Sequence, residues 1–178
     1  MANYVYIATS LDGYIATPDG GVEWLDEIPN PGGEDFGFAD FMERVDALLM
    51  GSATFGKVLS FGLWPYKKKV FVLSNRLSEV PEDLEGMAEI IAGEPEQVVR
   101  DLKNRGFGNL YVDGGKVIQS FLKEDLIDEM IITTVPVILG KGIPLFGELD
   151  HAIRFNHVET EVFNDYLVKS RYVRQRDE

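Results

Sequence analysis

The chain contains no cysteine. This absence excludes disulfide bonds, thiolate nucleophiles, zinc ribbons and iron–sulfur clusters held by cysteine. Histidine is almost as scarce, and the two that occur, His151 and His157, match none of the common metal-binding spacings. We therefore expect no metal site.

Basic residues are also few, with 17 Lys and Arg against 30 Asp and Glu, for a net charge of −13. This charge opposes nonspecific attraction to polyphosphates, so we expect neither nucleic acid nor a membrane as a partner. No apolar run approaches the ~20 residues needed to span a bilayer, and the N-terminus has no signal-peptide pattern. We expect a cytoplasmic protein.

What the chain does have is the composition of a folded globular protein, with 45% hydrophobic and 26% charged residues. Its 178 residues suit a single domain spanning 1–178. A Pro- and Gly-rich connection over 17–35 contains Trp24 and Leu25, and is too apolar to be a plain linker. We expect this segment to close over a functional site.

Short apolar runs alternate with helical patterns over the first two thirds of the chain. Strands are expected over 3–9, 47–50, 70–73, 90–92, 109–112 and 129–135, helices over 36–45, 52–59, 94–104 and 117–123, and closing strands over 153–158 and 166–173. Alternating strands and helices form parallel sheets through right-handed crossovers, whereas consecutive strands pair antiparallel. The order predicts an α/β fold with a mostly parallel mixed sheet and an antiparallel C-terminal edge.

Three expected strands end in small or turn-forming residues. These ends are Met50 to Thr54, Leu73 to Arg76, and Val112 to Lys116. The carboxyl ends of parallel strands line one crevice, where the N–H groups at helix N-termini bind phosphate. None of the three is a GxGxxG or P-loop motif, and each alone is equally consistent with a helix cap or turn. Together they predict an extended ligand that carries phosphate.

Four segments, in this order, resemble the reductase domain of bacterial bifunctional riboflavin-biosynthesis proteins, the RibD C-terminal type. The segments are SLDGYIA (10–16), RVDALLMGSATF (44–55), LYVDGGKVIQSFL (110–122) and LIDEMIITTVPVILGKGIPLF (126–146). The resemblance covers roughly residues 3–173. It implies a three-layer fold like that of dihydrofolate reductase and an NADPH-dependent oxidoreductase. We expect a stand-alone reductase-type domain, because a deaminase half would need a His/Cys zinc site.

The resemblance also implies which residues contact NADPH. They are Ala8, Ile15, Ala16, Gly51, Ser52, Thr54, Phe55, Ser74, Asn75, Arg76, Gly114, Gly115, Lys116 and Val117. Within this set, Ser74 to Arg76 would meet the adenosine 2′-phosphate, and a guanidinium suits a phosphate dianion. Gly114-Gly115 would open the pyrophosphate site and would be joined by a cis peptide bond.

The substrate region implied by the resemblance contains Tyr6, Trp24, Asp35 and Phe38. Asp35 falls where dihydrofolate reductases carry the carboxylate that binds the pterin, so it is the candidate catalytic residue, although a helix-capping role explains it equally. Asp12 and Asp113 each precede a glycine and are interpreted as turn residues. Tyr6 stands where riboflavin reductases usually have Lys, which weakens the case for their phosphoribosyl substrate.

We expect hydride delivery to a C=N or sugar carbonyl of a pyrimidine- or pterin-like substrate, as in 5-amino-6-(5-phosphoribosylamino)uracil reductase. A dihydrofolate or pteridine reductase and a non-catalytic nucleotide-binding homodimer are the alternatives. The apolar segment 130–139 and the strands after it would promote aggregation if they formed a free sheet edge. They predict a homodimer built from residues between about 129 and 173, and the resemblance implies the same interface.

Overall fold

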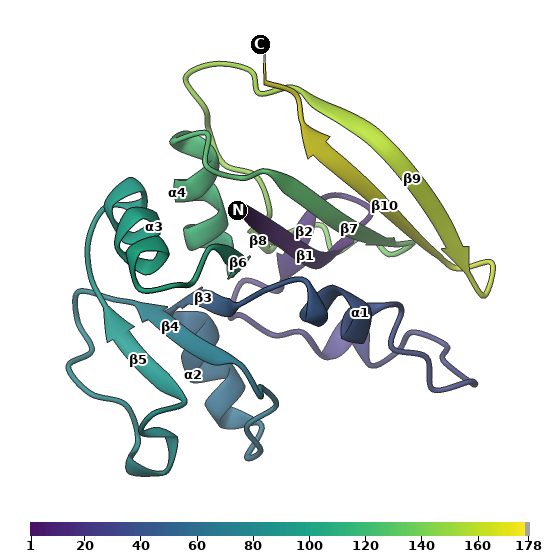
Figure 1. Ribbon diagram of the computed structural model, residues 1–178. Helices are drawn as coiled ribbons and strands as arrows, with labels where there is room; N and C mark the ends of the chain where they lie inside the picture. The colour runs from purple at the N-terminus through teal and green to yellow at the C-terminus, as the bar shows by residue number, and fades with distance from the viewer. Residues whose placement is uncertain (177–178) are drawn as a thin grey trace.

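An eight-stranded mixed sheet runs through the molecule (Figure 1), and the computed structural model describes residues 1–176 of it. The strand order is β5-β4-β3-β6-β1-β7-β10-β9. The first six strands in this order pair in parallel, and β10 and β9 pair antiparallel at one edge. The strands are β1 (Ala2–Ser10), β3 (Ala47–Gly51), β4 (Lys69–Leu73), β5 (Ala88–Ile91), β6 (Asn109–Asp113), β7 (Glu129–Val135), β9 (Phe155–Phe163) and β10 (Leu167–Arg174). The expected α/β class and antiparallel C-terminal edge are confirmed.

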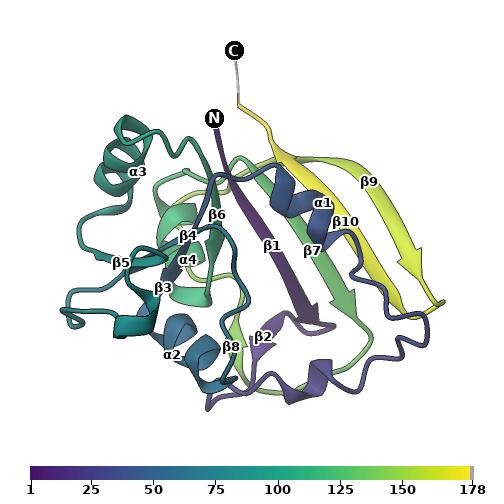
Figure 2. The ribbon, with the colours of Figure 1, turned by 60° about the horizontal axis from the view of Figure 1, so that its bottom comes forward.

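Helices cover both faces of this sheet, which makes three layers (Figure 2). They are α1 (Phe38–Glu43), α2 (Ser52–Ser60), α3 (Pro95–Asn104) and α4 (Gly115–Lys123). Side chains alternate along each strand, so every central strand contributes to both cores. On β6, Leu110 and Val112 belong to the core under α3 and α4, whereas Tyr111 belongs to the core under α1 and α2. We call the second side the α1 face.

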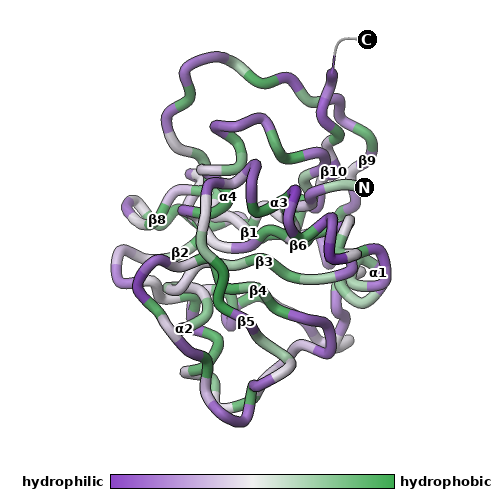
Figure 3. Tube along the Cα trace, turned by 60° about the vertical axis from the view of Figure 1, so that its left-hand side comes forward, coloured by the Kyte–Doolittle hydropathy of each residue, from purple (hydrophilic) through white to green (hydrophobic). Residues whose placement is uncertain are grey.

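The central strands are apolar on both sides because helices bury both of their faces. Residues 47–50 of β3 and 70–72 of β4 are fully buried, and the hydropathy colouring of Figure 3 shows them as hydrophobic segments. The C-terminal strands differ, since most residues of β9 are exposed. No helix among residues 1–176 is both long enough and apolar enough to cross a membrane.

Several short elements have no counterpart in the sequence prediction. The strands β2 (Tyr14–Ala16) and β8 (Ile143–Pro144) pair antiparallel in a small second sheet, and a 3₁₀ turn, η1 (Glu23–Leu25), interrupts the 17–35 connection. Elements of two or three residues are too short to show a periodicity, so only tertiary contacts define them. The strand expected over 153–158 begins at Phe155 and continues to Phe163. The sequence prediction ended it too early, because most of its residues are exposed and leave no apolar pattern of a buried face.

Candidate functional site

Four of the expected cofactor contacts meet where the carboxyl ends of β3 and β6 reach the starts of α2 and α4. A Cβ atom on Gly51 would come within 3.2 Å of the Val117 side chain, and a Cβ atom on Gly114 would collide with the Thr54 hydroxyl group. The carboxyl ends of parallel strands are where such sheets form their ligand crevice. We call the region of these four residues the glycine crevice.

Both helices that start at this crevice lack a side-chain cap. The N-cap residues are Gly51 for α2 and Gly114 for α4, and neither helix start receives a hydrogen bond from a capping side chain. Each helix has nine residues. The first N–H groups of a helix have no partner within the helix and lie at the positive end of its dipole. The crevice therefore presents two helix N-termini suited to phosphate.

The small β2–β8 sheet packs beside the start of α4. A Cβ atom on Gly115 would lie 3.1 Å from side-chain carbons of both Ile15 and Ile143. Ala16 pairs with Ile143 and is buried. The expected contacts Ile15 and Gly115 thus adjoin each other, and a side chain at Gly115 would require the Ile15 and Ile143 side chains to shift.

The expected cis peptide bond between Gly114 and Gly115 is wrong, because residues 1–176 contain no cis peptide bond. Gly114 has φ +94° instead, a value that glycine adopts without the steric penalty of a Cβ atom. This backbone conformation is enough to turn the chain from β6 into α4. The Gly114 N–H donates to the Asp113 carboxylate at 2.9 Å.

The end of β4 lies one strand away from the crevice, because Leu73 pairs with Gly51. Ser74 follows, and its hydroxyl oxygen accepts hydrogen bonds from the Arg76 and Leu77 N–H groups at 3.2 and 3.1 Å. Asn75 and Arg76 are exposed. The turn is therefore fixed by Ser74, and the Arg76 guanidinium extends from it at the surface.

Three other expected cofactor contacts differ in their surroundings. Ser52 and Lys116 are exposed at the starts of α2 and α4. The Phe55 ring, however, is buried in the core of the α1 face, with its centroid 5.9 Å from that of Trp64. Phe55 is apolar and lies one helical turn from the N-terminus of α2, where the helix faces inward. Its side chain therefore supports the helix from the core side.

Asp35 is exposed and caps the start of α1. Its carboxylate accepts hydrogen bonds from the N–H groups of Gly37 and Ala39, both at 2.9 Å. These bonds hold the pKa of Asp35 below its ordinary value, so the side chain is ionised at neutral pH. The geometry is that of the helix-capping interpretation, and it does not suit a proton donor.

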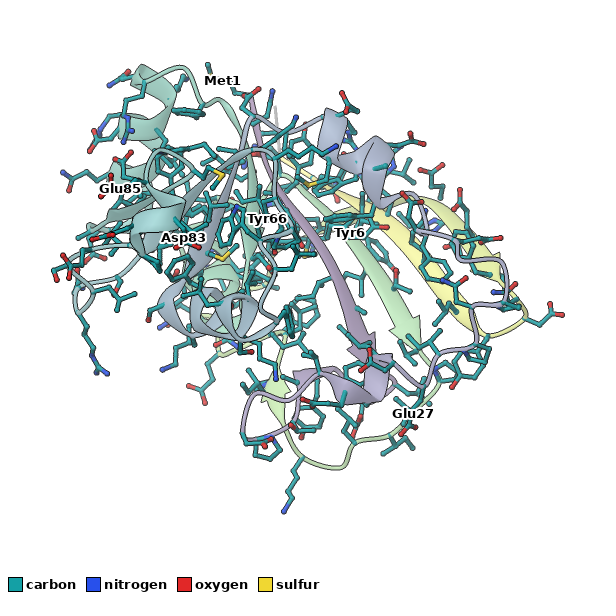
Figure 4. The ribbon with its side chains drawn as sticks, turned by 90° about the horizontal axis from the view of Figure 1, so that it is seen from below. Met1, Tyr6, Glu27, Tyr66, Asp83 and Glu85 are labelled. Atoms are coloured by element: carbon teal, nitrogen blue, oxygen red, sulfur yellow. The ribbon has the colours of Figure 1, made fainter. Side chains whose placement is uncertain are left out.

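Tyr6 and Phe38 meet on the α1 face, as expected of residues sharing a pocket. Their ring centroids are 5.4 Å apart, and Phe38 also lies 6.3 Å from Tyr111, whose hydroxyl donates to the Tyr6 carbonyl. Burial, followed by the charges of Asp35 and Glu161, raises the pKa of Tyr6 to about 12, so its hydroxyl stays protonated. Figure 4 shows this face with Tyr6 and Tyr66 labelled.

Trp24, the remaining expected substrate contact, lies in η1 of the 17–35 connection. Its indole Nε1 is buried and has no hydrogen-bond partner within the described chain, and the same is true of Trp64. The connection is held to α2 by the ion pair of Glu23 with Lys57 at 3.2 Å. A buried indole N–H without a partner is a donor that a ligand carbonyl could satisfy.

Asp113 is the functional candidate that the sequence interpretation missed. It ends β6 on the α1 face, and the charge of its carboxylate adds to burial in raising the pKa of Tyr66 and of Tyr111. Burial also raises the pKa of Asp113 itself to about 6, against the opposing effect of the Gly114 N–H. Its second oxygen has no hydrogen-bond partner among residues 1–176. An aspartate directly after the apolar residues 110–112 of a strand was the available signal, and its Asp-Gly context suggested only a turn.

A separate pocket of about 450 Å³ lies between α1 and the β9–β10 hairpin. We call it the α1–β10 pocket. Its lining residues are Tyr6, Gly37, Asp40, Phe41, Arg44, Ile131, Glu159, Glu161, Phe163, Lys169 and Arg171. Aromatic side chains from β1 and α1 therefore adjoin charged side chains from α1, β9 and β10.

Comparison with known proteins shows the family and the fold of this chain. The family model for the RibD C-terminal domain matches residues 4–168. The uncharacterized protein YwjB of Bacillus subtilis (strain 168) is 39% identical over 173 residues, with 96% of each chain covered. The crystal structure of a putative riboflavin biosynthesis protein from Shewanella sp. PV-4 is 52% identical, with a TM-score of 0.95, and covers 99% of this chain and 100% of that one.

A more distant structure identifies the fold. Dihydrofolate reductase from Enterococcus faecalis, complexed with NADP(H), superposes with a TM-score of 0.68 over 98% of this chain and 97% of that one, at 16% identity. The expected dihydrofolate-reductase-like fold is therefore confirmed. The family model extends over nearly the whole chain, and the sequence relatives agree with it. This chain belongs to the RibD C-terminal domain family, a reductase-like family.

Proposed function

We propose that the protein is an NADPH-dependent reductase that delivers a hydride to a pyrimidine- or pterin-like substrate. The glycine crevice is the observation that carries this proposal. It joins two uncapped helix N-termini at adjacent strand ends, and the glycines at the two N-cap positions place no side chain beside the first N–H groups. This arrangement suits a pyrophosphate bridge.

The residues around the crevice fit the parts of NADPH. The N–H groups at the starts of α2 and α4 would hold the pyrophosphate, and Arg76 would pair with the 2′-phosphate beyond the end of β4. Ile15 lies beside Gly115 and would exclude water from the nicotinamide side of the site. When bound, the cofactor supplies the hydride.

Asp113 is the group that we propose to supply the proton. Its pKa of about 6 leaves a useful protonated fraction near neutral pH, which an ordinary carboxyl does not have. It is also the residue directly before the glycine crevice, and one of its oxygens is held by the Gly114 N–H. The other oxygen is available to donate its proton to a substrate atom.

The relatives support a reductase and a place in riboflavin chemistry. The Shewanella structure is described as a putative riboflavin biosynthesis protein, and the Enterococcus reductase binds NADP(H). The residue at position 6 separates this chain from the usual riboflavin reductases, since a tyrosine replaces their lysine. We therefore propose the reaction type and the ring class of the substrate from the family, and not its phosphoribosyl group.

Cofactor binding and turnover test the proposal separately. NADPH should quench the fluorescence of Trp24 and Trp64, and NADPH absorbance should fall when an aminouracil or an oxidised pteridine is added. Absence of NADPH binding would overturn the reductase assignment. Binding without turnover on either substrate class would favour the non-catalytic nucleotide-binding homodimer.

We further propose that the protein is a homodimer through its C-terminal strands. Val158, Val162 and Val168 are 44%, 61% and 39% exposed, and they belong to neither core cluster. Val162 and Val168 pair with each other on the face of β9 and β10 opposite the α1–β10 pocket, the same face of β10 that lines a groove of about 370 Å³ together with Phe146 and other apolar side chains. A second copy covering this face would bury it.

A further inference from the structure

Asp12, interpreted from the sequence as a turn residue, makes contacts that a turn does not require. Its carboxylate accepts a hydrogen bond from the Ser10 hydroxyl at 2.6 Å, which fixes the turn locally. It also accepts hydrogen bonds from the main-chain N–H groups of Leu139 and Gly140, at 3.1 and 2.8 Å, which lie 127 and 128 positions away. The Ser10 bond, followed by the two main-chain bonds, holds the pKa of Asp12 below its ordinary value. The acceptor is therefore an ionised carboxylate at neutral pH.

A second Asp-Gly turn shows what the local contact does alone. Asp19 accepts a hydrogen bond from the Thr17 hydroxyl two positions earlier, just as Asp12 does from Ser10. The glycines that follow Asp12 and Asp19 have φ of +87° and +84°, so the two turns are alike in backbone shape. Within residues 1–176, the hydrogen bonds of Asp19 go to neighbours in the sequence. A turn of this shape thus forms without distant partners, and the bonds of Asp12 to residues 139–140 serve another purpose.

Asp12 holds the loop of residues 136–142, which connects β7 to β8. Gly140 in this loop has φ +76°, a left-handed conformation that suits glycine. Two successive N–H groups of the loop donate to the Asp12 carboxylate, one to each oxygen, and such pairs form concave sites for anions. The main chains also meet, because the Leu11 N–H donates to the Val137 carbonyl at 2.7 Å. The carboxylate therefore fixes the course of the loop just before β8 begins.

β8 in turn contacts the start of α4. The Ile143 Cγ2 and Ile15 Cδ1 atoms each lie 3.1 Å from the position that a Cβ atom on Gly115 would take. The side-chain amide of Gln119, on α4, donates to the Pro144 carbonyl at 2.8 Å. A displacement of β8 would therefore be transmitted to the start of α4, where the glycine crevice lies.

The other contacts of β8 come from the main chain and from close packing. β8 pairs with β2, and the Leu145 N–H donates to the Gly13 carbonyl at 3.0 Å. A Cβ atom on Gly142 would collide with the Ala16 carbonyl, so the loop and β2 are in close contact. Asp12 differs because it is a single exposed side chain. A substitution there removes its hydrogen bonds without opening a cavity in the core.

We propose that Asp12 is a positioning residue for the cofactor, which holds loop 136–142, and through it β8, against the start of α4. This inference rests on the proposed reductase function and adds to it a residue that does not touch the cofactor. Ile15 and Gly115 are expected contacts of NADPH, and Ile143 packs against both sides of this contact. Without the Asp12 carboxylate, β8 would move away from α4 and the edge of the glycine crevice would open to water.

Asp46 provides a matched control for Asp12. Its carboxylate accepts hydrogen bonds from the N–H groups of Gly108 and Asn109, at 3.0 and 2.7 Å, which lie 62 and 63 positions away. Asp46 is exposed, as Asp12 is. It lies directly before β3, at the end of that strand opposite to the glycine crevice. The same chemistry thus holds a distant segment in both places, and Asp12 alone of the two holds one beside the crevice.

NADPH affinity and stability are measured for matched variants of the full chain, by fluorescence titration and by urea unfolding. Asp12→Ala should weaken NADPH binding by about tenfold or more. Asp12→Asn should weaken it by about threefold to tenfold, because the amide oxygen still accepts one N–H group. Asp46→Ala and Asp46→Asn should lose stability to a similar extent but change NADPH affinity by less than about twofold. Equal losses of NADPH affinity at the two positions would overturn the proposal.

A double variant tests whether Asp12 acts through β8. If Asp12 positions Ile143 against Gly115, its effect should shrink once the Ile143 side chain has been removed. The loss of NADPH affinity caused by Asp12→Ala should then fall below about threefold in the Ile143→Ala background. A merely structural role for Asp12 would give the same loss in both backgrounds, and that result would also overturn the proposal.

The position of β8 is also measurable without the cofactor. The nuclear Overhauser effect between the Ile143 γ2 methyl group and the α protons of Gly115 should be strong in the unmodified protein and in Asp46→Asn. It should be weak or absent in Asp12→Asn, and an unchanged signal there would overturn the positioning role.

The two measurements separate this inference from the reductase proposal. If NADPH binds and the Asp12 variants bind it normally, the positioning role fails and the reductase proposal stands. If NADPH does not bind to the unmodified protein, the reductase proposal fails, and the nuclear Overhauser effect still decides whether Asp12 positions β8.

Discussion

The glycine crevice and the α1–β10 pocket are built in opposite ways. The crevice presents main-chain N–H groups of two helix starts, and glycines stand at both N-cap positions. The pocket instead presents long charged side chains joined in ion pairs, such as that of Lys169 with Glu161. A backbone site suits a ligand part that never changes, whereas a side-chain site is easily altered by substitution. The comparison suggests that the cofactor is the fixed element of this enzyme and the substrate the adjustable one.

Closing the glycine crevice should produce the largest effect. In Gly114→Val, the new side chain would occupy the position of the Thr54 hydroxyl, and the φ of +94° would be strained. Loss of two charge-assisted phosphate contacts of about 2 kcal/mol each corresponds to about a thousandfold weaker NADPH binding. Fluorescence titration measures this change.

Gly106→Ala is the matched control for that variant. Gly106 also has φ +94°, but a Cβ atom there would meet no atom within 4 Å. It should share the backbone strain and keep normal NADPH affinity. If both variants lost NADPH equally, strain and not the crevice would be responsible.

Removing the proposed proton donor should have the next largest effect. Asp113→Asn should lower kcat by about a hundredfold and leave NADPH affinity unchanged, because an amide keeps the contact with the Gly114 N–H but cannot donate a carboxyl proton. In the unmodified enzyme, kcat/KM should decrease as the pH rises above about 6, where Asp113 ionises. Steady-state kinetics across this pH range provide the measurement.

The same variant should be more stable than the unmodified protein at high pH. The pKa of Asp113 is raised from 3.8 to about 6 in the folded state, so the folded state holds the proton more tightly than the unfolded chain does. Its contribution to stability is complete below pH 3.8 and is lost as the pH rises through about 6. Asp113→Asn avoids this loss, worth about 2 to 3 kcal/mol at pH 8. Denaturant titrations at pH 4 and pH 8 measure the stability of both proteins. The same difference in stability between Asp113→Asn and the unmodified protein at the two pH values would contradict the raised pKa of Asp113.

Arg76 is the side chain that we propose to contact the cofactor, whereas the contacts at the glycine crevice come from the backbone. Arg76→Ala should weaken NADPH binding by about tenfold to a hundredfold and leave NADH binding nearly unchanged, because only NADPH carries the 2′-phosphate. Parallel titrations with both cofactors measure the ratio. Equal losses for the two cofactors would show that Arg76 does not contact that phosphate.

The smallest effect on turnover is expected at the face opposite the α1–β10 pocket. Val162→Lys places a charge on the exposed face of β9 and should shift the protein from dimer toward a monomer of 20.0 kDa, while the pocket keeps its lining residues. Light scattering reports the mass, and kcat should change less than about twofold. A mass near 20 kDa for the unmodified protein at every concentration would exclude the homodimer.

The sequence by itself was sufficient for the order of the eight strands of the main sheet and the four α-helices, and for the glycines at the strand ends. The periodicity of strands and helices is a local property of the chain. Gly51, Gly114 and Gly115 likewise follow directly on strands, where the backbone turns into a helix. The motifs that resemble the RibD C-terminal type supplied the fold for the same reason. Features that depend on neighbouring residues along the chain can be predicted from the sequence.

Only the tertiary structure decided the roles of the charged residues. The sequence made Asp35 the catalytic candidate and Asp113 a turn residue, but Asp35 caps a helix at the surface, which lowers its pKa, and Asp113 is partly buried near Tyr66 and Tyr111, which raises its pKa. Lys169 reaches the Phe36 carbonyl from 133 positions away. The electrostatic environment of a side chain depends on which distant segments desolvate it and pair with it, and no local pattern records those contacts.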